Sequence, residues 1–300
     1  MTWHRTSPGW WLLGASLLLG AGPAPGASYV LTIQGLAGND AYGQRFTREA
    51  QKAHQALSAG AEASLLAGDG ATRDNILGEL EQWAGQVRED DQVTVLMIGH
   101  GAYRNGEYRF AIPGPDLTGA DIGSALDQLS ARRQVLINTS SASGVLHDQL
   151  SARDGRIVVT ATRSAREIQA PRFSAHFVAA LDLRTADLDK DRRISLGEAF
   201  GFAQRAVADD FESEDLLATE HPRLEGDGPE RITLTRLGGA EPDADAALLA
   251  RRQALNDEID ALRARRGDML ETDYLETLQG LLVQLALVES RIEESGDGEP

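Results

Sequence analysis

His100 is the residue of this chain whose neighbours best suit it for chemistry. It follows the apolar run Val93–Ile98 and stands between Gly99 and Gly101. A histidine can act as a general base near neutral pH. A glycine beside it lets the backbone approach a ligand closely and offers its N–H to a developing oxyanion. The pattern therefore predicts one half of a catalytic or binding site at this point.

A group of serines supplies the second half. Ser140, Ser141 and Ser143 follow a short apolar run, Val135–Ile137, and precede Gly144. Small hydroxyl residues directly after a buried strand are candidates for a nucleophile or for hydrogen bonds to a substrate. Which of Ser140 and Ser141 faces the site stays open, because a slip of one residue moves a side chain to the other face of a strand.

Both motifs end apolar runs of the kind that form buried parallel strands. Ligands of open α/β sheets collect at the carboxyl edge of the sheet, and neighbouring strands lie about 4.8 Å apart. We therefore expect the two motifs to meet at one edge. In this site His100 is the candidate base and Gly101 a candidate substrate-binding residue. Ser140 and Ser141 are the candidate nucleophile and the candidate substrate-binding hydroxyl, in an order that the residues alone leave open.

The acidic stretch 187–198, which reads D-L-D-K-D-R-R-I-S-L-G-E, is a second candidate site and could bind a metal ion. Its oxygen donors fall at the spacing of an EF-hand calcium loop. They are Asp187, Asp189, Asp191, the backbone carbonyl of Arg193, Ser195 and Glu198.

The sixth position of this loop carries Arg192 where a glycine is usual, because the chain turns there with φ > 0. A side chain in that conformation costs roughly 1–2 kcal/mol. We therefore predict weak calcium binding, with a dissociation constant on the order of 10⁻⁴–10⁻³ M. The alternative is an acidic turn that caps the following helix and binds no ion.

Residues 1–27 are predicted to be a cleaved signal peptide. A weakly basic start precedes an apolar run at 9–20, and small residues at 21–28 supply the cleavage site. The apolar run is shorter than the roughly 20 residues that a membrane span needs. The protein is thus expected to be exported, to the periplasm or out of the cell.

The charge and the cysteine count narrow the partners and the chemistry. The formal net charge is −17, and such an acidic surface disfavours nucleic acid and anionic lipid, because both are bound through lysine and arginine. Peptides and proteins remain as partners. The chain has no cysteine, so it forms no disulfide and has no thiol nucleophile.

Short apolar strands alternate with helices along most of the chain. This order predicts an α/β fold with a mainly parallel sheet covered on both faces, in a domain spanning about residues 28–240. Edge strands are predicted at Tyr108–Ile112 and Arg231–Thr235. His147 and His221 have no partner at metal-ligand spacing and are predicted to be surface or packing residues.

The last part of the chain, about residues 243–294, is predicted to be an α-helical hairpin, coiled-coil-like in its apolar spacing. The apolar residues of the predicted seam are Leu248, Leu255, Ile259, Leu262 and Met269, then Leu275, Leu278, Leu282, Leu285 and Ile292. Such a hairpin favours contact with a partner or self-association. The alternative is a solvated tail helix that packs on the domain.

Taken in order, these motifs resemble the legumain-type cysteine peptidases, which have the caspase-like fold. The resemblance covers roughly residues 29–208. The strand leading to His100 is similar to that family's catalytic histidine strand, and 136–144 to its nucleophile strand, whose pattern is Ala-Cys-x-Ser-Gly. Placing Ser143 and Gly144 on the Ser-Gly of the pattern puts Ser140 at the alanine and Ser141 at the cysteine.

The resemblance implies a three-layer caspase-like sandwich. Residues 156–167 are similar to the family's next strand, which implies that Glu167 helps to build the substrate pocket. The family also carries an orienting asparagine after its first strand. Ala41 occupies the matching position here, and Asn39 lies two residues away.

The functional prediction depends on Ser141, which stands where the family has its catalytic cysteine. A serine hydroxyl is far less acidic than a thiol and needs a base held by a third group. We therefore predict a pseudopeptidase that binds peptides or protein partners through a degenerate cleft. One alternative is an active peptidase with Ser141 as nucleophile and His100 as base. The other is a calcium-dependent interaction module.

Overall fold

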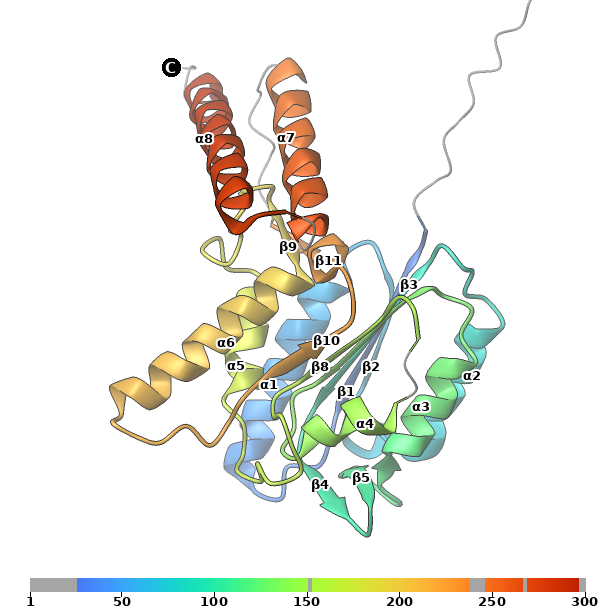
Figure 1. Ribbon diagram of the computed structural model, residues 1–300. Helices are drawn as coiled ribbons and strands as arrows, with labels where there is room; N and C mark the ends of the chain where they lie inside the picture. Colours follow the sequence, from blue (N-terminus) through green and yellow to red (C-terminus); the bar gives the residue numbers. More distant parts are fainter. Residues whose placement is uncertain (1–25, 151–152, 238–245, 267–268, 297–300) are drawn as a thin grey trace, which may run out of the picture.

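A six-stranded sheet lies at the centre of the computed structural model, which describes residues 26–150, 153–237, 246–266 and 269–296. The strand order is β10-β8-β7-β3-β1-β2, and every neighbouring pair is parallel except β10 with β8. Figure 1 shows this sheet between two groups of helices. The strands are β1 Ser28–Gln34, β2 Glu62–Leu66, β3 Gln92–Ile98, β7 Arg133–Asn138, β8 Arg156–Thr160 and β10 Arg223–Glu225. The predicted mixed α/β fold with a mainly parallel sheet is confirmed.

Helices cover both faces of this sheet. Two separate apolar clusters are buried, one between the sheet and α1, α5 and α6, the other between the sheet and α2, α3 and α4. The helices are α1 Asp40–Leu57, α2 Arg73–Ala84, α3 Gly119–Asp127, α4 Leu146–Gln149, α5 Phe173–Ala180 and α6 Leu196–Ser213. Successive residues of β3 alternate between the clusters, Val95 and Met97 in one and Leu96 and Ile98 in the other. This explains why the strands read as unbroken apolar runs.

Side-chain caps determine where several helices begin. Thr118 Oγ1 accepts the N–H of Asp121 and the Asp121 carboxylate accepts the N–H of Thr118, both at 3.1 Å, so a capping box starts α3. Asn39 caps α1 by accepting the N–H of Tyr42. α1 therefore begins at Asp40.

Both predicted edge strands lie outside the central sheet. β5, Glu107–Phe110, pairs with β4, Gly101–Arg104, and with β6, Leu117–Thr118, in a small antiparallel sheet. β11, Thr233–Arg236, pairs with β9, Arg193–Ser195. The strand at the edge of the main sheet is instead β10, in a polar stretch whose three residues carry no apolar periodicity.

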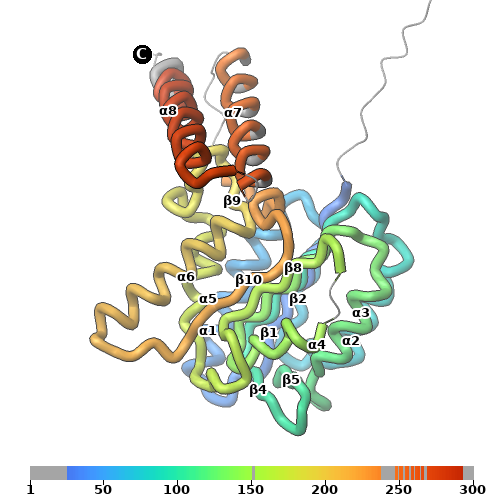
Figure 2. The backbone as a smooth tube through the Cα atoms, in the orientation of Figure 1, coloured from blue at the N-terminus to red at the C-terminus, as the bar shows by residue number. Residues whose placement is uncertain are grey.

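The C-terminal helices α7 (Ala246–Ala264) and α8 (Glu271–Gly296) pack along each other and project from one end of the α/β domain (Figures 1 and 2). Their contact is a third apolar cluster whose buried members are Leu255, Ile259, Leu285, Val288 and Ile292. The predicted seam is wrong in part, because Leu275 and Leu282 are 54% and 40% exposed.

The predicted signal peptide lies outside the described residues, except for Gly26 and Ala27. Among the residues that the structure describes, no helix has both the length and the apolar character that crossing a membrane would require.

Candidate functional site

His100 lies directly after β3, where the chain leaves the sheet to enter β4. Its Nε2 donates to the carbonyl of Ala37 at 3.0 Å, and its ring packs edge-on against Tyr42 and Phe46, with centroids 4.8 and 5.1 Å away. A carbonyl accepts only, so Nε2 carries the proton and Nδ1 is the nitrogen left to act as a base. The imidazole is therefore well oriented.

The hydrogen bond that orients His100 is accepted by a backbone carbonyl, and among the described residues no side chain is hydrogen-bonded to the imidazole. Asn39, the asparagine nearest to the expected orienting position, uses its Oδ1 to cap α1. The carbonyl of Ala37, which follows β1, takes the orienting place. Sequence reasoning missed this contact because a carbonyl is present at every residue and leaves no signal in the side-chain pattern.

Gly101 is the point where the two strand ends meet. A Cβ on Gly101 would lie 2.3 Å from Ser140 Oγ and 2.4 Å from the carbonyl oxygen of Ser141, so only glycine fits there. The register of β3 and β7 brings this about, since Met97 is paired with Asn138 and the N–H of Thr139 donates to the Met97 carbonyl. The structure thus brings together the two motifs that the sequence analysis joined into one site.

Ser140 is fully buried in a closed ring of hydrogen bonds. Asn138 Nδ2 donates to the Tyr108 hydroxyl at 2.7 Å, and the Ser140 hydroxyl donates to Asn138 Oδ1 at 2.8 Å. The third bond, 2.6 Å between the Tyr108 and Ser140 hydroxyls, then has Tyr108 as its donor. Burial raises the pKa of Tyr108, which keeps the phenol protonated for this purpose. The Ser140 hydroxyl therefore uses its proton for a hydrogen bond within the ring.

Ser141 lies beside this ring and is 5% exposed. Within the described part of the chain, no hydrogen bond joins its hydroxyl to His100 or to another group. The next residue, Ala142, has a left-handed backbone with φ 54°, and its N–H donates to the carbonyl of Glu167 at 2.9 Å. Ser141 therefore has no bonded base, and the amide after it is occupied.

Glu167 links two loops near Ser141. Its carboxylate accepts the N–H of Arg163 at 3.0 Å, the N–H of His221 at 3.1 Å and His221 Nδ1 at 2.8 Å. The carboxylate is thus occupied by the protein's own groups. His221, predicted to be a surface or packing residue, holds the loop before β10 to the loop after β8, whereas His147 lies apart with its Nε2 3.0 Å from Thr160 Oγ1.

A shallow depression of about 750 Å³ opens at the start of α1, beside the Ala37 carbonyl that anchors His100. It is lined by Ala37, Gly38, Asn39, Asp40, Gly43, Gln44, Thr47 and Arg48. Ala37 belongs both to this depression and to the contact that orients the imidazole. An extended segment lying in the depression would therefore reach the carboxyl edge of the sheet near His100.

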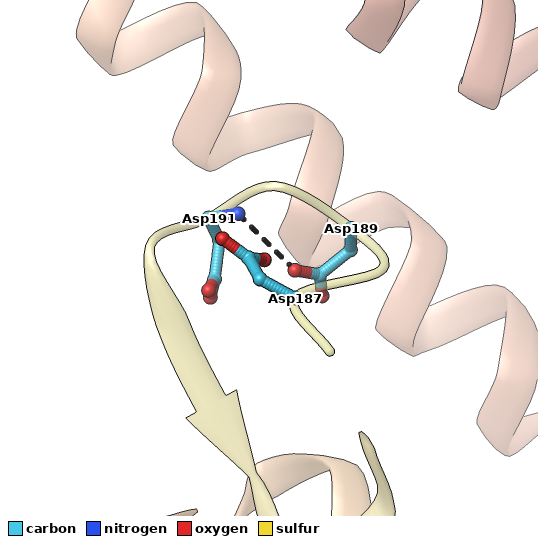
Figure 3. Close-up of side chains that lie close together, drawn as sticks. All are labelled: Asp187, Asp189 and Asp191. Carbon is cyan, nitrogen blue, oxygen red and sulfur yellow. Dashed lines mark hydrogen bonds between the residues drawn. The ribbon is translucent and has the colours of Figure 1, made fainter. Parts of the chain in front are cut away.

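The acidic loop lies between α5 and α6, and its three aspartates turn toward the inside of its bend (Figure 3). One carboxylate oxygen from each of Asp187, Asp189 and Asp191 lies within 4.8 Å of the others. Arg192 has the expected positive φ, at 63°, and its N–H donates to Asp187 Oδ2 at 3.0 Å. The loop thus adopts the turn that its spacing predicts, despite the arginine.

Two other predicted ligands, Ser195 and Glu198, are hydrogen-bonded to each other. Glu198 accepts the N–H and the hydroxyl of Ser195, at 2.9 and 2.8 Å, in the capping box of α6, while its second oxygen accepts the N–H of Leu188 at 2.8 Å. Arg193 is the first residue of β9, and its guanidinium Nε donates to Asp191 at 2.6 Å. Ser195 and Glu198 therefore cap α6.

Two observations test whether a cation fits this loop. Asp187 Oδ1 is buried and has no hydrogen-bond partner among the described residues. Burial, with the charges of Glu198 and Asp191, raises the pKa of Asp187 to about 6, and burial with the charges of Asp191 and Glu198 raises the pKa of Asp189 to about 7. Crowded, partly desolvated carboxylates of this kind gain from a hard cation.

No protein-family model matches the chain, and no curated protein matches its sequence significantly.

Proposed function

We propose that this protein is an exported pseudopeptidase of caspase- or legumain-like type. It has a three-layer domain at about residues 28–240, with an EF-hand-like loop at 187–198, and a C-terminal α-helical hairpin at about 243–294. It binds a peptide or a protein partner through the cleft beside His100 and Ser141. The neighbouring positions of β3 and β7, which carry the two motifs, support this proposal.

The hydrogen bonding of Ser140 and Ser141 is the observation that supports the proposal most. A serine nucleophile needs a hydrogen-bonded base and free donors for the oxyanion. The Ser140 hydroxyl donates its hydrogen bond to Asn138 Oδ1, and Ser141 has no bond to His100. The N–H of Ala142 donates to the backbone carbonyl of Glu167. A strand edge with an oriented imidazole and no activated nucleophile is suited to binding without hydrolysis.

A fluorophosphonate probe tests this conclusion, because it labels activated serines. We expect the chain lacking residues 1–27 to remain unlabelled under conditions that label a serine peptidase fully. Labelling of the wild type that disappears both in His100→Ala and in Ser141→Ala would instead establish the alternative, a peptidase with Ser141 as nucleophile and His100 as base.

Thiol variants test the geometry of the cleft independently of activity. The chain has no cysteine, so a single introduced thiol is the only site for iodoacetamide. Ser141→Cys should react at least about ten-fold faster than Ser140→Cys, because Ser140 is fully enclosed. Addition of His100→Ala to Ser141→Cys should slow alkylation, since the imidazole favours the thiolate. Equal rates at both positions would contradict the proposed cleft.

Binding is measured directly by the fluorescence anisotropy of a pool of fluorescein-labelled peptides. Ser141→Ala should retain wild-type affinity within about two-fold, because a pseudopeptidase does not use the hydroxyl. Arg48→Glu, in the depression at the start of α1, should change the affinity for charged peptides. Absence of any bound peptide in the pool would count against a peptide cleft.

The acidic loop favours a second function, calcium-dependent interaction. Its carboxylates would hold Ca²⁺ through the oxygen donors expected from the sequence. The buried, unpartnered Asp187 Oδ1 is the observation that favours it. Arg192 opposes binding through its positive charge, so the affinity is expected to be low.

Calorimetric titration with Ca²⁺ tests this function. We expect binding on the order of 10⁻⁴–10⁻³ M, a loss of binding in Asp189→Ala, and tighter binding in Arg192→Gly. The tighter binding is expected because the variant removes the Arg192 charge beside the carboxylates. The left-handed strain of roughly 1–2 kcal/mol is already present in the ion-free loop, so its relief should raise the melting temperature. No heat and no change in melting temperature at several millimolar Ca²⁺, in the wild type and in Arg192→Gly alike, would remove calcium from the account.

A further inference from the structure

The middle of α8 is apolar on two sides. None of residues 277–288 is charged. One side packs on α7 through Leu285 and Val288. The other side exposes an outer stripe, which consists of Leu275, Leu282, Val283, Ala286 and Leu287. The exposed fraction is 54% for Leu275, 40% for Leu282, 53% for Val283 and 61% for Leu287.

The α/β domain leaves this stripe uncovered. In Figures 1 and 2, α7 and α8 stand out from the end of the domain opposite β4 and β5. Their apolar cluster is separate from the two clusters of the domain, and its fully buried part is small. A helix that is apolar on both sides is normally buried on both.

We infer that the outer stripe of α8 is a self-association surface that a second copy of this chain covers. A two-fold contact uses the same patch on both copies, so one self-complementary stripe is enough. Residues 275 and 282 are one heptad apart, and 282 with 286 and 283 with 287 are four apart. This spacing aligns them along one face of the helix.

A membrane is the less suitable cover. The charge-free stretch 277–288 is about 18 Å long at 1.5 Å per residue, compared with about 30 Å for the hydrocarbon core of a bilayer. Glu271, Asp273 and Glu276 stand at its N-terminal end, and the whole chain has a net charge of −17. Such charge opposes binding to an anionic membrane surface.

The exposed area agrees with a weak dimer. Four leucine and valine side chains, each exposing roughly 100 Å², bring on the order of 800 Å² to the contact from two copies. Ala286 and Gln279 on the same face add to this. Specific interfaces begin near about 1,000–1,200 Å² in total. The two copies are therefore expected to associate at micromolar concentrations and to separate on dilution.

Sedimentation velocity of the chain lacking residues 1–27, between about 1 and 200 μM, tests the inference. The weight-average mass should rise with concentration toward twice the monomer mass. Val283→Glu combined with Leu287→Glu places charge in the stripe and should weaken association by at least about ten-fold. Leu282→Glu is a second, independent disruption. The test does not involve the cleft, so its failure would leave the proposed function standing.

The matched control is Thr277→Glu, which adds the same charge to an exposed position on another face of α8. It should leave association unchanged, and circular dichroism should show equal helix content in all variants. A wild type that stays monomeric at 200 μM overturns the inference. So does a dimer that survives the stripe variants, or a monomer that sediments with neutral phosphatidylcholine vesicles.

Discussion

Ser140 and Ser141 are adjacent in the sequence, yet their hydroxyls have different surroundings. Ser140 completes a ring with Tyr108 and Asn138 in which every donor has an acceptor. Ser141 stands outside that ring. The ring also joins β5 to the end of β7. Tyr108 and Asn138, which occupy the Ser140 hydroxyl, therefore also hold the small antiparallel sheet in place.

Tyr108→Phe should destabilise the fold by about 1–3 kcal/mol, because it leaves buried polar groups of Asn138 and Ser140 without a partner. Urea denaturation measures this. Tyr103→Phe is the control, since Tyr103 is 43% exposed on β4 and its change should stay within about 0.5 kcal/mol. Equal midpoints for the two variants would contradict the importance of the ring.

At the scale of elements, α7 carries an unusual buried group. Asn256 is 4% exposed, and neither polar atom of its side chain has a hydrogen-bond partner among the described residues. It follows Leu255 and precedes Ile259, both buried in the cluster with α8. A polar residue of this kind costs stability, and in coiled coils it can set the register of the helices.

Asn256→Leu should therefore strengthen the pairing of α7 and α8 by about 1–3 kcal/mol. Amide hydrogen exchange in α7 is the suitable measurement, because the helix pair can open separately from the domain. The exchange should slow in Asn256→Leu and remain unchanged in Ala250→Leu, which adds a leucine at an exposed position of the same helix. Faster exchange in Asn256→Leu would show that the asparagine has a stabilising partner.

At the scale of the whole molecule, the acidic loop makes stability depend on pH. The pKa values of Asp187 and Asp189 are raised to about 6 and about 7 in the fold, compared with about 3.9 in an unfolded chain. Between these values the folded protein binds more protons than the unfolded one. Its stability from these groups is thus greatest at low pH and falls as pH rises through 6 and 7.

In the presence of EDTA, the melting temperature should fall as pH rises from 5 to 8. Asp189→Asn should flatten this dependence, because the amide does not titrate, whereas Asp69→Asn, at an exposed position outside the loop, should not. Calcium requires the ionised carboxylates, so its affinity should drop as pH falls from 8 to 6. Parallel pH profiles for the wild type and Asp189→Asn would contradict this account.

Much of the architecture follows from local patterns. Apolar runs identified β3 and β7, and the carboxylate spacing at 187–198 predicted a loop whose sixth residue has a positive φ. These features depend on residues within a few positions of one another. Periodicity and turn chemistry therefore suffice to predict them.

The state of the site was decided by contacts between distant segments. The His100 anchor comes from a carbonyl 63 residues earlier, and the Glu167 carboxylate is held by His221, 54 residues later. The edge position of β10 and the exposure of Leu275 and Leu282 likewise depend on packing partners. By itself, the sequence determined which groups reach the carboxyl edge of the sheet. Only the tertiary structure decided which of them stay free, because hydrogen bonds and burial depend on partners that no local pattern contains.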